Sequence, residues 1–537
     1  MDDRPSPDLA IGGFSERGPW VVDPESMRWR RTIDSVRARA RDEVPVLLST
    51  GHLPPLGRLL RVVSRVGFAL GGWYLRERRR GAPHSRVGLS HRLRVAFAHL
   101  GPTYIKLGQI VSSGDGLFPD ELVREFKQLR DRVPPEPFDD VRRVVEADLG
   151  RPLDEVFTTF ERTPIAAASI AQVHAATLRT GESVVVKVQR PQIARLVRQD
   201  IEAMAWLAPR LIGRIPVAAL ANPPALVELF AETIVEELDF RLEAANMLDI
   251  ARVLAVTEQS ATIVPRPHPD LVTRRVLVME RLDGFGWDDV DAMRAAGVDT
   301  EAVLHAGLVG FMEGAMLFGV FHGDLHGGNL MVRPDGRTVL MDFGITGRLD
   351  ETQRLAFLML LMGATTGDVM GQLRALRDLG AFPADTDLEL VFRDLGLDRG
   401  PVDATQLSAD ELVHELQELT KKLLAYGAHA PKELMLFVKN MMFLDSAIGA
   451  LAPDLDILGE IEKVHREIAF RHGERLARDL GIDLSEVTFD PDAVKAAMGI
   501  SLDVEKLTHA DVKQRREIVK QRLEEAREAR KAAPDVS

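Results

Sequence analysis

Two acidic side chains and one carboxamide near the middle of the sequence have the types and spacing that phosphoryl transfer requires. Residues 321–332 read Phe-His-Gly-Asp-Leu-His-Gly-Gly-Asn-Leu-Met-Val, and residues 340–344 read Leu-Met-Asp-Phe-Gly. In phosphoryl transfer from a nucleotide, one aspartate orients or deprotonates the attacking hydroxyl, while an asparagine and a second aspartate hold the magnesium that bridges the phosphates. We assign the first role to Asp324, and the magnesium to Asn329 and Asp342.

Local structure must bring these residues together. Short apolar strands are predicted at 330–332 and 338–341, joined by the Pro-Asp-Gly turn of residues 334–336. This hairpin would place Asn329 and Asp342 at the same end.

Lysine usage points to another part of the same site. Of the 68 basic residues 13 are lysine, and Lys187 is the single one between residues 128 and 420. It lies on the second strand of a hairpin predicted at 173–178 and 183–189, after the small-residue run 166–174. A nucleotide kinase places its phosphate-pairing lysine on such a strand.

A buried lysine needs an acidic partner. Helices are predicted over residues 193–212 and 224–256, and Glu236, Asp239 and Glu243 fall near one face of the second, with Glu237 beside it. We expect one of these carboxylates to pair with Lys187, although a solvated acidic face would show the same pattern.

Further along the chain, a strand predicted over 272–282 is followed by Gly284, which suits a hinge between two lobes. The backbone from Glu280 to Leu282 would then face the adenine edge of a nucleotide. Residues 351–475 are strongly helical, and Met435, Met441 and Met442 are expected in the core. Residues 503–532 are predicted to form an exposed, highly charged helical tail.

Composition sets limits on the function. The chain has 537 residues and no cysteine, which excludes disulfides, thiolate metal sites and a cysteine nucleophile. The sequence has no run of about 18 uncharged apolar residues, and the nearest, 303–321, is interrupted by His305 and Glu313 and is interpreted as a buried helix. An N-terminus that is acidic and lacks an apolar signal segment predicts a cytoplasmic location.

The first part of the chain is basic, although the net charge is −13: residues 1–100 hold 18 Arg against 10 acidic residues. Residues 1–25 are predicted to be a disordered arm. A helix over residues 57–80 interleaves Phe68, Trp73, Tyr74 and other apolar side chains with arginines. It could lie peripherally on the anionic inner face of a membrane, or pack on the main domain with its arginines solvated. Nucleic acid is a poorer fit, because the rest of the chain is acidic and has no aromatic stacking platform.

Residues 90–133 are predicted to form two helices with a break at 114–116, the first of which carries Lys106 and Gln109. Together these segments resemble the AarF/UbiB family of atypical protein-kinase-like proteins. The resemblance covers roughly residues 85–460. It rests on Lys106-Leu-Gly-Gln109, the alanine-rich loop 166–174 in place of a glycine-rich loop, Val186-Lys-Val-Gln-Arg-Pro191, Glu237-Leu-Asp239 with Glu243, and the two magnesium motifs.

The resemblance implies an α+β chain with a two-lobed protein-kinase-like fold, a helical N-terminal extension with a Lys-x-Gly-Gln motif, and additional C-terminal helices. The implied domains are a basic arm and amphipathic helix (1–84), the helical extension (85–155), an N-lobe with inserted helices (156–284), a C-lobe (285–475) and a charged helical tail (476–537).

The resemblance also implies roles at the site, with ATP and Mg²⁺ as cofactors. Lys106 and Gln109 would cover the site close to Glu237 and Asp239, and Glu243 would be the partner of Lys187. The nucleotide would lie against Ala167, Ala168, Ser169, Ile170, Ala171 and Gln172. Members of the family resemble ATP-dependent factors for isoprenoid quinone or other lipid metabolism at membranes, so a lipid or quinone-precursor partner is expected and protein substrates are not.

Two other functions share part of this pattern. A small-molecule phosphotransferase of the aminoglycoside or choline kinase type also uses His-Gly-Asp-Leu-His followed by Asn, but the alanine-rich loop and the Lys-Leu-Gly-Gln motif argue against it. A non-catalytic, nucleotide-dependent lipid-binding scaffold would not need the complete set Lys187, Asp324, Asn329 and Asp342.

Overall fold

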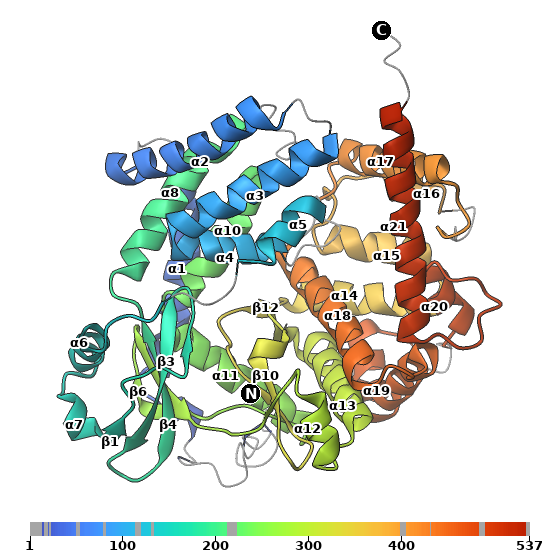
Figure 1. Ribbon diagram of the computed structural model, residues 1–537. Helices are drawn as coiled ribbons and strands as arrows, with labels where there is room; N and C mark the ends of the chain where they lie inside the picture. Colours follow the sequence, from blue (N-terminus) through green and yellow to red (C-terminus); the bar gives the residue numbers. More distant parts are fainter. Residues whose placement is uncertain are drawn as a thin grey trace.

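The computed structural model describes residues 13–14, 20, 23–49, 54–78, 82–112, 120–129, 134–211, 223–397, 404–429, 431–482 and 489–532. An antiparallel sheet lies beside a group of helices from the first part of the chain, and a larger helical body is built by the second half (Figure 1). The predicted α+β class is confirmed. The sheet and the helical body supply opposite sides of the candidate site.

The main sheet has the strand order β1-β3-β4-β7-β6, with β2 paired to β3. The strands are β1 (Phe157–Phe160), β2 (Ala166–Ala167), β3 (Ala171–Leu178), β4 (Ser183–Gln189), β6 (Pro267–Val272) and β7 (Val276–Glu280). Side chains alternate along a strand. Val184, Val186 and Val188 of β4 therefore point into a core shared with α6 (Phe138–Leu149), which leaves Lys187 on the opposite face.

That opposite face is covered by α11 (Phe240–Val256), which follows α10 (Pro223–Glu237). The prediction of one continuous helix over 224–256 is wrong, because the helix breaks after Glu237. Asp239 has φ −137° and caps α11, where its side chain accepts a hydrogen bond from the backbone N–H of Arg241. Aspartate is favoured at such a cap and disfavoured within a helix. Glu236, Asp239 and Glu243 therefore do not share one face of a single helix.

The second half begins with α12 (Val290–Ala295) and α13 (Thr300–Glu313). A short π-helix, η3 (Gly314–Phe318), then connects α13 to β9 (Val320–His322). β10 (Leu330–Val332) and β11 (Thr338–Leu340) form the predicted hairpin, flanked by β5 (Thr262–Ile263) and β8 (Phe285–Gly286). The chain then pairs β12 (Thr346–Arg348) with β9. The following helices are α14 (Glu351–Thr366), α15 (Val369–Asp378), α16 (Leu388–Asp394), α17 (Ala409–Ala425), α18 (Lys432–Leu451), α19 (Ile457–Leu480), α20 (Pro491–Ala497) and α21 (His509–Ala532).

About half of the described side chains of α21 are exposed, so the tail is less exposed than predicted, and it is attached to α18 by a 2.6 Å ion pair between Arg516 and Asp445. The expectation that the methionines of α18 lie in the core is wrong for Met441 and Met442, which are 37% and 39% exposed. Two helical stretches, Thr300–Phe318 and Lys432–Leu451, could cross a membrane by length and composition alone. Within the protein, 50% and 39% of their most apolar windows are buried, respectively.

The first part of the chain forms α1 (Ile33–Leu48), α2 (Leu56–Arg76), α3 (Ala82–Leu100), α4 (Pro102–Ser112) and α5 (Asp120–Phe126), which gather around α8 (Ile193–Leu211) and α10 (Figure 1). The predicted first helix of 90–133 is divided in two at Gly101, whose φ of +105° favours glycine. The break predicted at 114–116 lies outside the described residues.

The disordered arm predicted over 1–25 is wrong where the structure describes it. Phe14 is 3% exposed and pairs with Val264, and the Arg266 guanidinium lies 4.6 Å from the centre of its ring.

Candidate active site

Asp324, Asn329 and Asp342 lie on one connected stretch of backbone. The chain leaves β9 through Asp324, turns in a short 3₁₀-helix, η4 (Gly327–Asn329), and enters β10. Asn329 Nδ2 donates to the carbonyl of Asp324 at 3.0 Å, and the N–H of Met341 donates to the carbonyl of Asn329 at 2.9 Å. The hairpin therefore brings Asn329 and Asp342 to the same end.

His322, which was not among the predicted site residues, joins the two aspartate segments. Its Nε2 donates to the carbonyl of Asp342 at 2.9 Å, and its Nδ1 accepts from the N–H of Asp324 at 3.1 Å. Burial lowers the pKa of His322, so the imidazole is neutral and its tautomer is set by these two contacts.

Lys187 lies where the sequence predicts an ion pair. Its Nζ is 2.6 Å from Glu243 Oε1 on α11 and 3.1 Å from Asp342 Oδ1. The side chains of Lys187 and Glu243 are 10% and 4% exposed, whereas that of Asp342 is 49% exposed. The lysine and the glutamate thus form a buried pair, and the Asp342 carboxylate remains open to a ligand.

The charges around Lys187 oppose the effect of burial. Burial would lower the pKa of Lys187, but Asp342 and Glu243 outweigh it, so the pKa is raised and the lysine stays charged. Burial would raise the pKa of Asp342, but Lys187 and Lys106 lower it to about 2. Burial raises the pKa of Glu243 to about 7 in spite of Lys187.

Lys106 reaches the same group of carboxylates from α4. Its Nζ is 3.0 Å from Glu237 Oε1 at the end of α10. Burial would lower the pKa of Lys106, but the negative charges of Glu237, Asp324 and Asp342 outweigh it, so the pKa is raised and the lysine stays charged. Gln109 lies about one turn further along α4.

Asp239 does not share the position of Glu237. Because it caps α11, its carboxylate pairs with Arg241 at 2.6 Å. The expected approach of Lys106 to Glu237 is therefore confirmed, whereas the carboxylate of Asp239 forms its ion pair with Arg241.

The alanine-rich loop is a tight connection between β2 and β3, and the N–H of Ala168 donates to the carbonyl of Ala171 at 2.8 Å. The buried Arg190 is hydrogen-bonded to this loop twice. The Nε of Arg190 donates to the carbonyl of Ala168, and the backbone N–H of Arg190 donates to the carbonyl of Ile170, both at 2.9 Å. Ala167 ends β2, and Ser169 and Ile170 lie in this connection.

The side chain of Gln172, which was predicted to line the nucleotide site, is hydrogen-bonded within the protein. Its Oε1 accepts from the N–H of Glu136 at 2.8 Å, and its Nε2 lies 2.7 Å from His174. Glu280 ends β7, where its backbone N–H donates to the carbonyl of Arg266, and Leu282 lies in the connection to β8.

A third lysine was missed by sequence reasoning. Lys439 on α18 lies 2.5 Å from Asp324 Oδ1, and their side chains are 25% and 19% exposed. Burial would raise the pKa of Asp324, but Lys439 and Lys106 hold that pKa well below its usual range. The adjacent Asn440 is fully buried and accepts from the N–H of Leu325 at 2.9 Å. The available signal was a Lys-Asn pair in the middle of an apolar helix.

The donors at this site suit magnesium. Asp342 offers an ionised carboxylate, and because Asn329 Nδ2 is already donating, its Oδ1 remains for a cation. Magnesium prefers oxygen ligands and typically takes one or two protein groups together with water and phosphate oxygens. The residues that the structure describes contain no group of three or more His, Cys, Asp or Glu arranged as a self-sufficient metal site.

Comparisons with known proteins agree with this arrangement. Residues 128–375 match the ABC1 atypical kinase-like domain. The uncharacterized protein Rv0647c of Mycobacterium tuberculosis is 38% identical over 383 residues, 68% of this chain and 75% of that protein. An uncharacterized chloroplastic aarF domain-containing protein kinase of Arabidopsis thaliana is 34% identical, with 68% and 72% covered. A probable protein kinase UbiB of Marinobacter nauticus is 33% identical, with 73% and 71% covered.

Proposed function

The chain belongs to the ABC1 (AarF/UbiB) atypical kinase-like family, and from this premise we propose that it binds Mg²⁺·ATP and uses the terminal phosphoryl group. The observation that carries the proposal is the convergence of Lys187 and Asp342 at 3.1 Å beside a buried glutamate. When bound, Mg²⁺·ATP supplies the phosphoryl group and the metal charge that neutralises its oxygens.

Each residue of the site has a role in this reaction that follows from its position and charge. Lys187, held by Glu243, provides a fixed positive charge for the phosphates, and Asp342 and Asn329 provide oxygen ligands. Asp324 stays ionised and can accept the proton of an acceptor hydroxyl. Lys106 adds a second positive charge from the α4 side.

We propose further that the acceptor or effector is a lipid such as a quinone precursor, met at an anionic membrane surface through α2. Support comes from the outer face of α2, where Phe68 is 79% and Leu75 is 83% exposed, next to the exposed Arg61, Arg65 and Arg76. Exposed apolar side chains among arginines are typical of helices that lie on anionic bilayers.

Asp342→Asn tests the nucleotide site. The substitution removes the carboxylate that meets both Lys187 and the metal, so we expect ATP turnover to fall by roughly 100-fold or more and Mg²⁺-dependent ATP binding to be lost. Calorimetric titration of ATP with Mg²⁺ and with EDTA measures the second effect. The proposal would be refuted if the native chain bound ATP as tightly in EDTA as in Mg²⁺ and the variant bound ATP as tightly as the native chain.

A further inference from the structure

A pocket lined by arginines lies outside the candidate active site. It has a volume of about 650 Å³ and is bounded by the end of β4, the first turns of α8 and the β6–β7 turn. Five arginines line it against a single carboxylate, Asp148; they are Arg190, Arg195, Arg198, Arg274 and Arg275. On a chain of net charge −13, this is a local reversal of sign.

Three of these arginines are neutralised by the protein. Arg190 pairs with Glu136 at 2.8 Å and Arg275 pairs with Asp148 at 2.5 Å. Arg198 pairs with Glu43, which raises the pKa of this arginine. Their charges are therefore accounted for within the fold.

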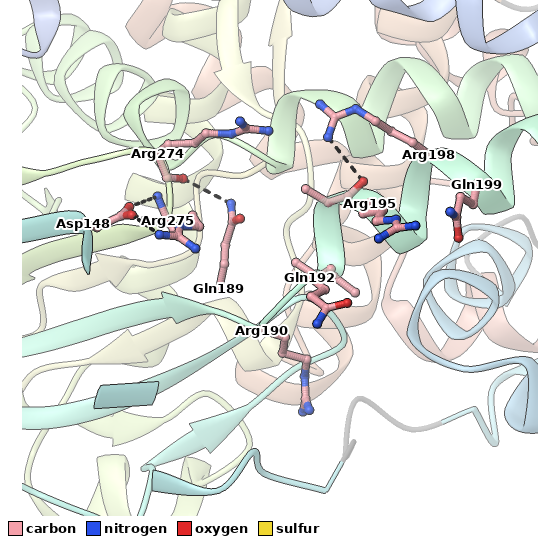
Figure 2. A pocket seen from close by; sticks show the side chains of 11 residues that line it. Asp148, Gln189, Arg190, Gln192, Arg195, Arg198, Gln199, Arg274 and Arg275 are labelled. Atoms are coloured by element: carbon pink, nitrogen blue, oxygen red, sulfur yellow. Dashed lines mark hydrogen bonds and ion pairs between the residues drawn. The ribbon is translucent and has the colours of Figure 1, made fainter. Parts of the chain in front are cut away.

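The other two arginines are not neutralised. In the part of the chain that the structure describes, the guanidinium groups of Arg195 and Arg274 have neither a hydrogen bond nor an ion pair. In Figure 2 the side chains of Arg274 and Arg198 extend toward one another from opposite walls of the pocket. The carboxamides of Gln192 and Gln199 line the same space. The two unpaired guanidinium groups carry like charges that repel one another, and an anion bound between them would relieve this repulsion.

We propose that this pocket binds a phosphate-bearing ligand, held by the guanidinium groups of Arg195 and Arg274. Guanidinium groups match phosphate oxygens with paired N–H donors, and two of them on separate walls suit an anion with several oxygens. The volume is within the range of small-molecule sites. The source of the phosphate is either a soluble phosphate or the headgroup of a lipid.

The pocket is joined to the elements that carry the Lys187–Glu243 ion pair. The carbonyl of Arg274 accepts from the N–H of Phe240, the first residue of α11, at 3.0 Å. The same carbonyl accepts from Nε2 of Gln189, two residues after Lys187, at 3.2 Å. A ligand on Arg274 would thus contact the turn that holds both elements.

The test compares the full chain with Arg195→Ala/Arg274→Ala. Because neither guanidinium has a protein partner, we expect the double variant to melt at the same or a higher temperature than the native chain in phosphate-free buffer. Titration calorimetry with inorganic pyrophosphate in EDTA should show binding to the native chain and at least about tenfold weaker binding to the variant, which corresponds to about 1.4 kcal/mol.

Two controls locate the binding. Arg374→Ala on α15 removes an exposed arginine far along the chain and should leave pyrophosphate affinity unchanged. Lys187→Met removes the candidate phosphate charge of the active site. Binding that survives Lys187→Met but not the double variant belongs to this pocket, whether or not the chain uses ATP.

Flotation with phosphatidylcholine vesicles containing phosphatidic acid distinguishes the two phosphate sources. Arginine-dependent binding of pyrophosphate identifies a soluble ligand, and arginine-dependent flotation without pyrophosphate binding identifies a headgroup. The arginines of α2 are the same in both proteins, so the difference between the proteins reports the pocket. Equal pyrophosphate binding and equal flotation of the native and double-variant proteins would overturn the proposal.

Discussion

Three lysines from three separate elements meet carboxylates around one site. Lys106 of α4 pairs with Glu237, Lys187 of β4 with Glu243 and Asp342, and Lys439 of α18 with Asp324. The chain uses arginine for most of its positive charge. A lysine ammonium is a compact point charge on a flexible stem, whereas the planar guanidinium demands a broader partner. Lysine therefore suits a site where one compact charge must meet individual carboxylate oxygens, as Lys187 does with one oxygen each of Glu243 and Asp342.

We expect Lys439 to act through Asp324. Lys439→Met should reduce ATP turnover by roughly 10-fold to 100-fold, because the aspartate loses the group that orients its carboxylate, while the affinity for Mg²⁺·ATP stays within about twofold. Steady-state kinetics and equilibrium nucleotide binding separate the two effects. Lys439→Arg should recover part of the turnover.

A double-mutant cycle tests whether Lys439 acts through Asp324. If Lys439 works only by positioning Asp324, adding Lys439→Met to Asp324→Asn should cause little further loss. Additive losses in the double variant would show that Lys439 has a separate, structural role in α18.

Glu243 should make stability depend on pH in a defined direction. Its pKa is raised in the native state from 4.5 to about 7, so between these values the native chain holds a proton that the unfolded chain has released. The stability from this group is complete below pH 4.5 and is lost as the pH rises through about 7. The side chain introduced by Glu243→Gln does not titrate. The free energy of unfolding of this variant, relative to that of the native chain, should therefore increase from about pH 5 to about pH 8. Urea unfolding of both proteins at the two pH values measures this, and a constant or opposite difference would contradict it.

At the scale of elements, the confirmed predictions are those in which the local sequence pattern and the tertiary contacts favour the same structure. The β10–β11 hairpin and the placement of Lys187 on β4 follow from alternation and turn residues. The division of α10 from α11 was missed because Asp239 was counted as part of an acidic helical face rather than as a cap. Lys439 was missed because its contact with Asp324 spans 115 positions, and the local sequence marks it only as a polar position in an apolar helix.

The same limit applies to Gln172 and Trp73. The side chain of Gln172 contacts Glu136 and His174, and the local sequence does not predict these contacts. Trp73 was named among the apolar side chains with which the helix could lie on a membrane, but it is 8% exposed and its Nε1 donates to Ser85 Oγ at 2.9 Å. α2 thus presents two faces, and only side chains on its outer face are free to meet a membrane.

That distinction leads to a prediction for α2. Burial of a phenylalanine side chain contributes roughly 1.5–3 kcal/mol, so Phe68→Ser should weaken binding to anionic vesicles by roughly 10-fold to 100-fold. Phe470→Ser on α19 is the matched control, because Phe470 is even more exposed, at 92%, but belongs to another element. Flotation at low salt compares the two variants with the native chain.

The basic part of α2 can be tested in the same assay. Arg76→Gln with Arg78→Gln should weaken flotation at low salt and make it less dependent on salt, because each arginine contributes on the order of 1 kcal/mol near an anionic surface and salt screens that contribution. Arg79 and Arg80, which continue the run in the sequence, lie outside the described residues. Flotation of the Phe68 variant equal to that of the native chain would mean that α2 only packs on the protein body.

At the scale of the whole molecule, the N-terminal helices close one side of the site that the sheet and the helical body form. Lys106 of α4 reaches Glu237 at 3.0 Å, and the charges of Asp324 and Asp342 also raise its pKa. An acceptor must therefore reach Asp324 past a helix that is tied to the protein by an ion pair. An extended polypeptide needs a long open groove along the site, whereas a single hydroxyl on a slender lipid chain does not.

We therefore expect the native chain to consume ATP without phosphorylating casein. Radiolabel from γ-labelled ATP should not appear in casein under conditions in which an ordinary casein kinase labels it fully. A hydroxyl-bearing isoprenoid in vesicles should raise ATP consumption above the rate with plain vesicles, because a slender acceptor can pass α4 and place its hydroxyl at Asp324. Strong casein labelling that is lost in Asp342→Asn would show that α4 leaves room for a polypeptide, and would assign the protein to kinases that act on proteins.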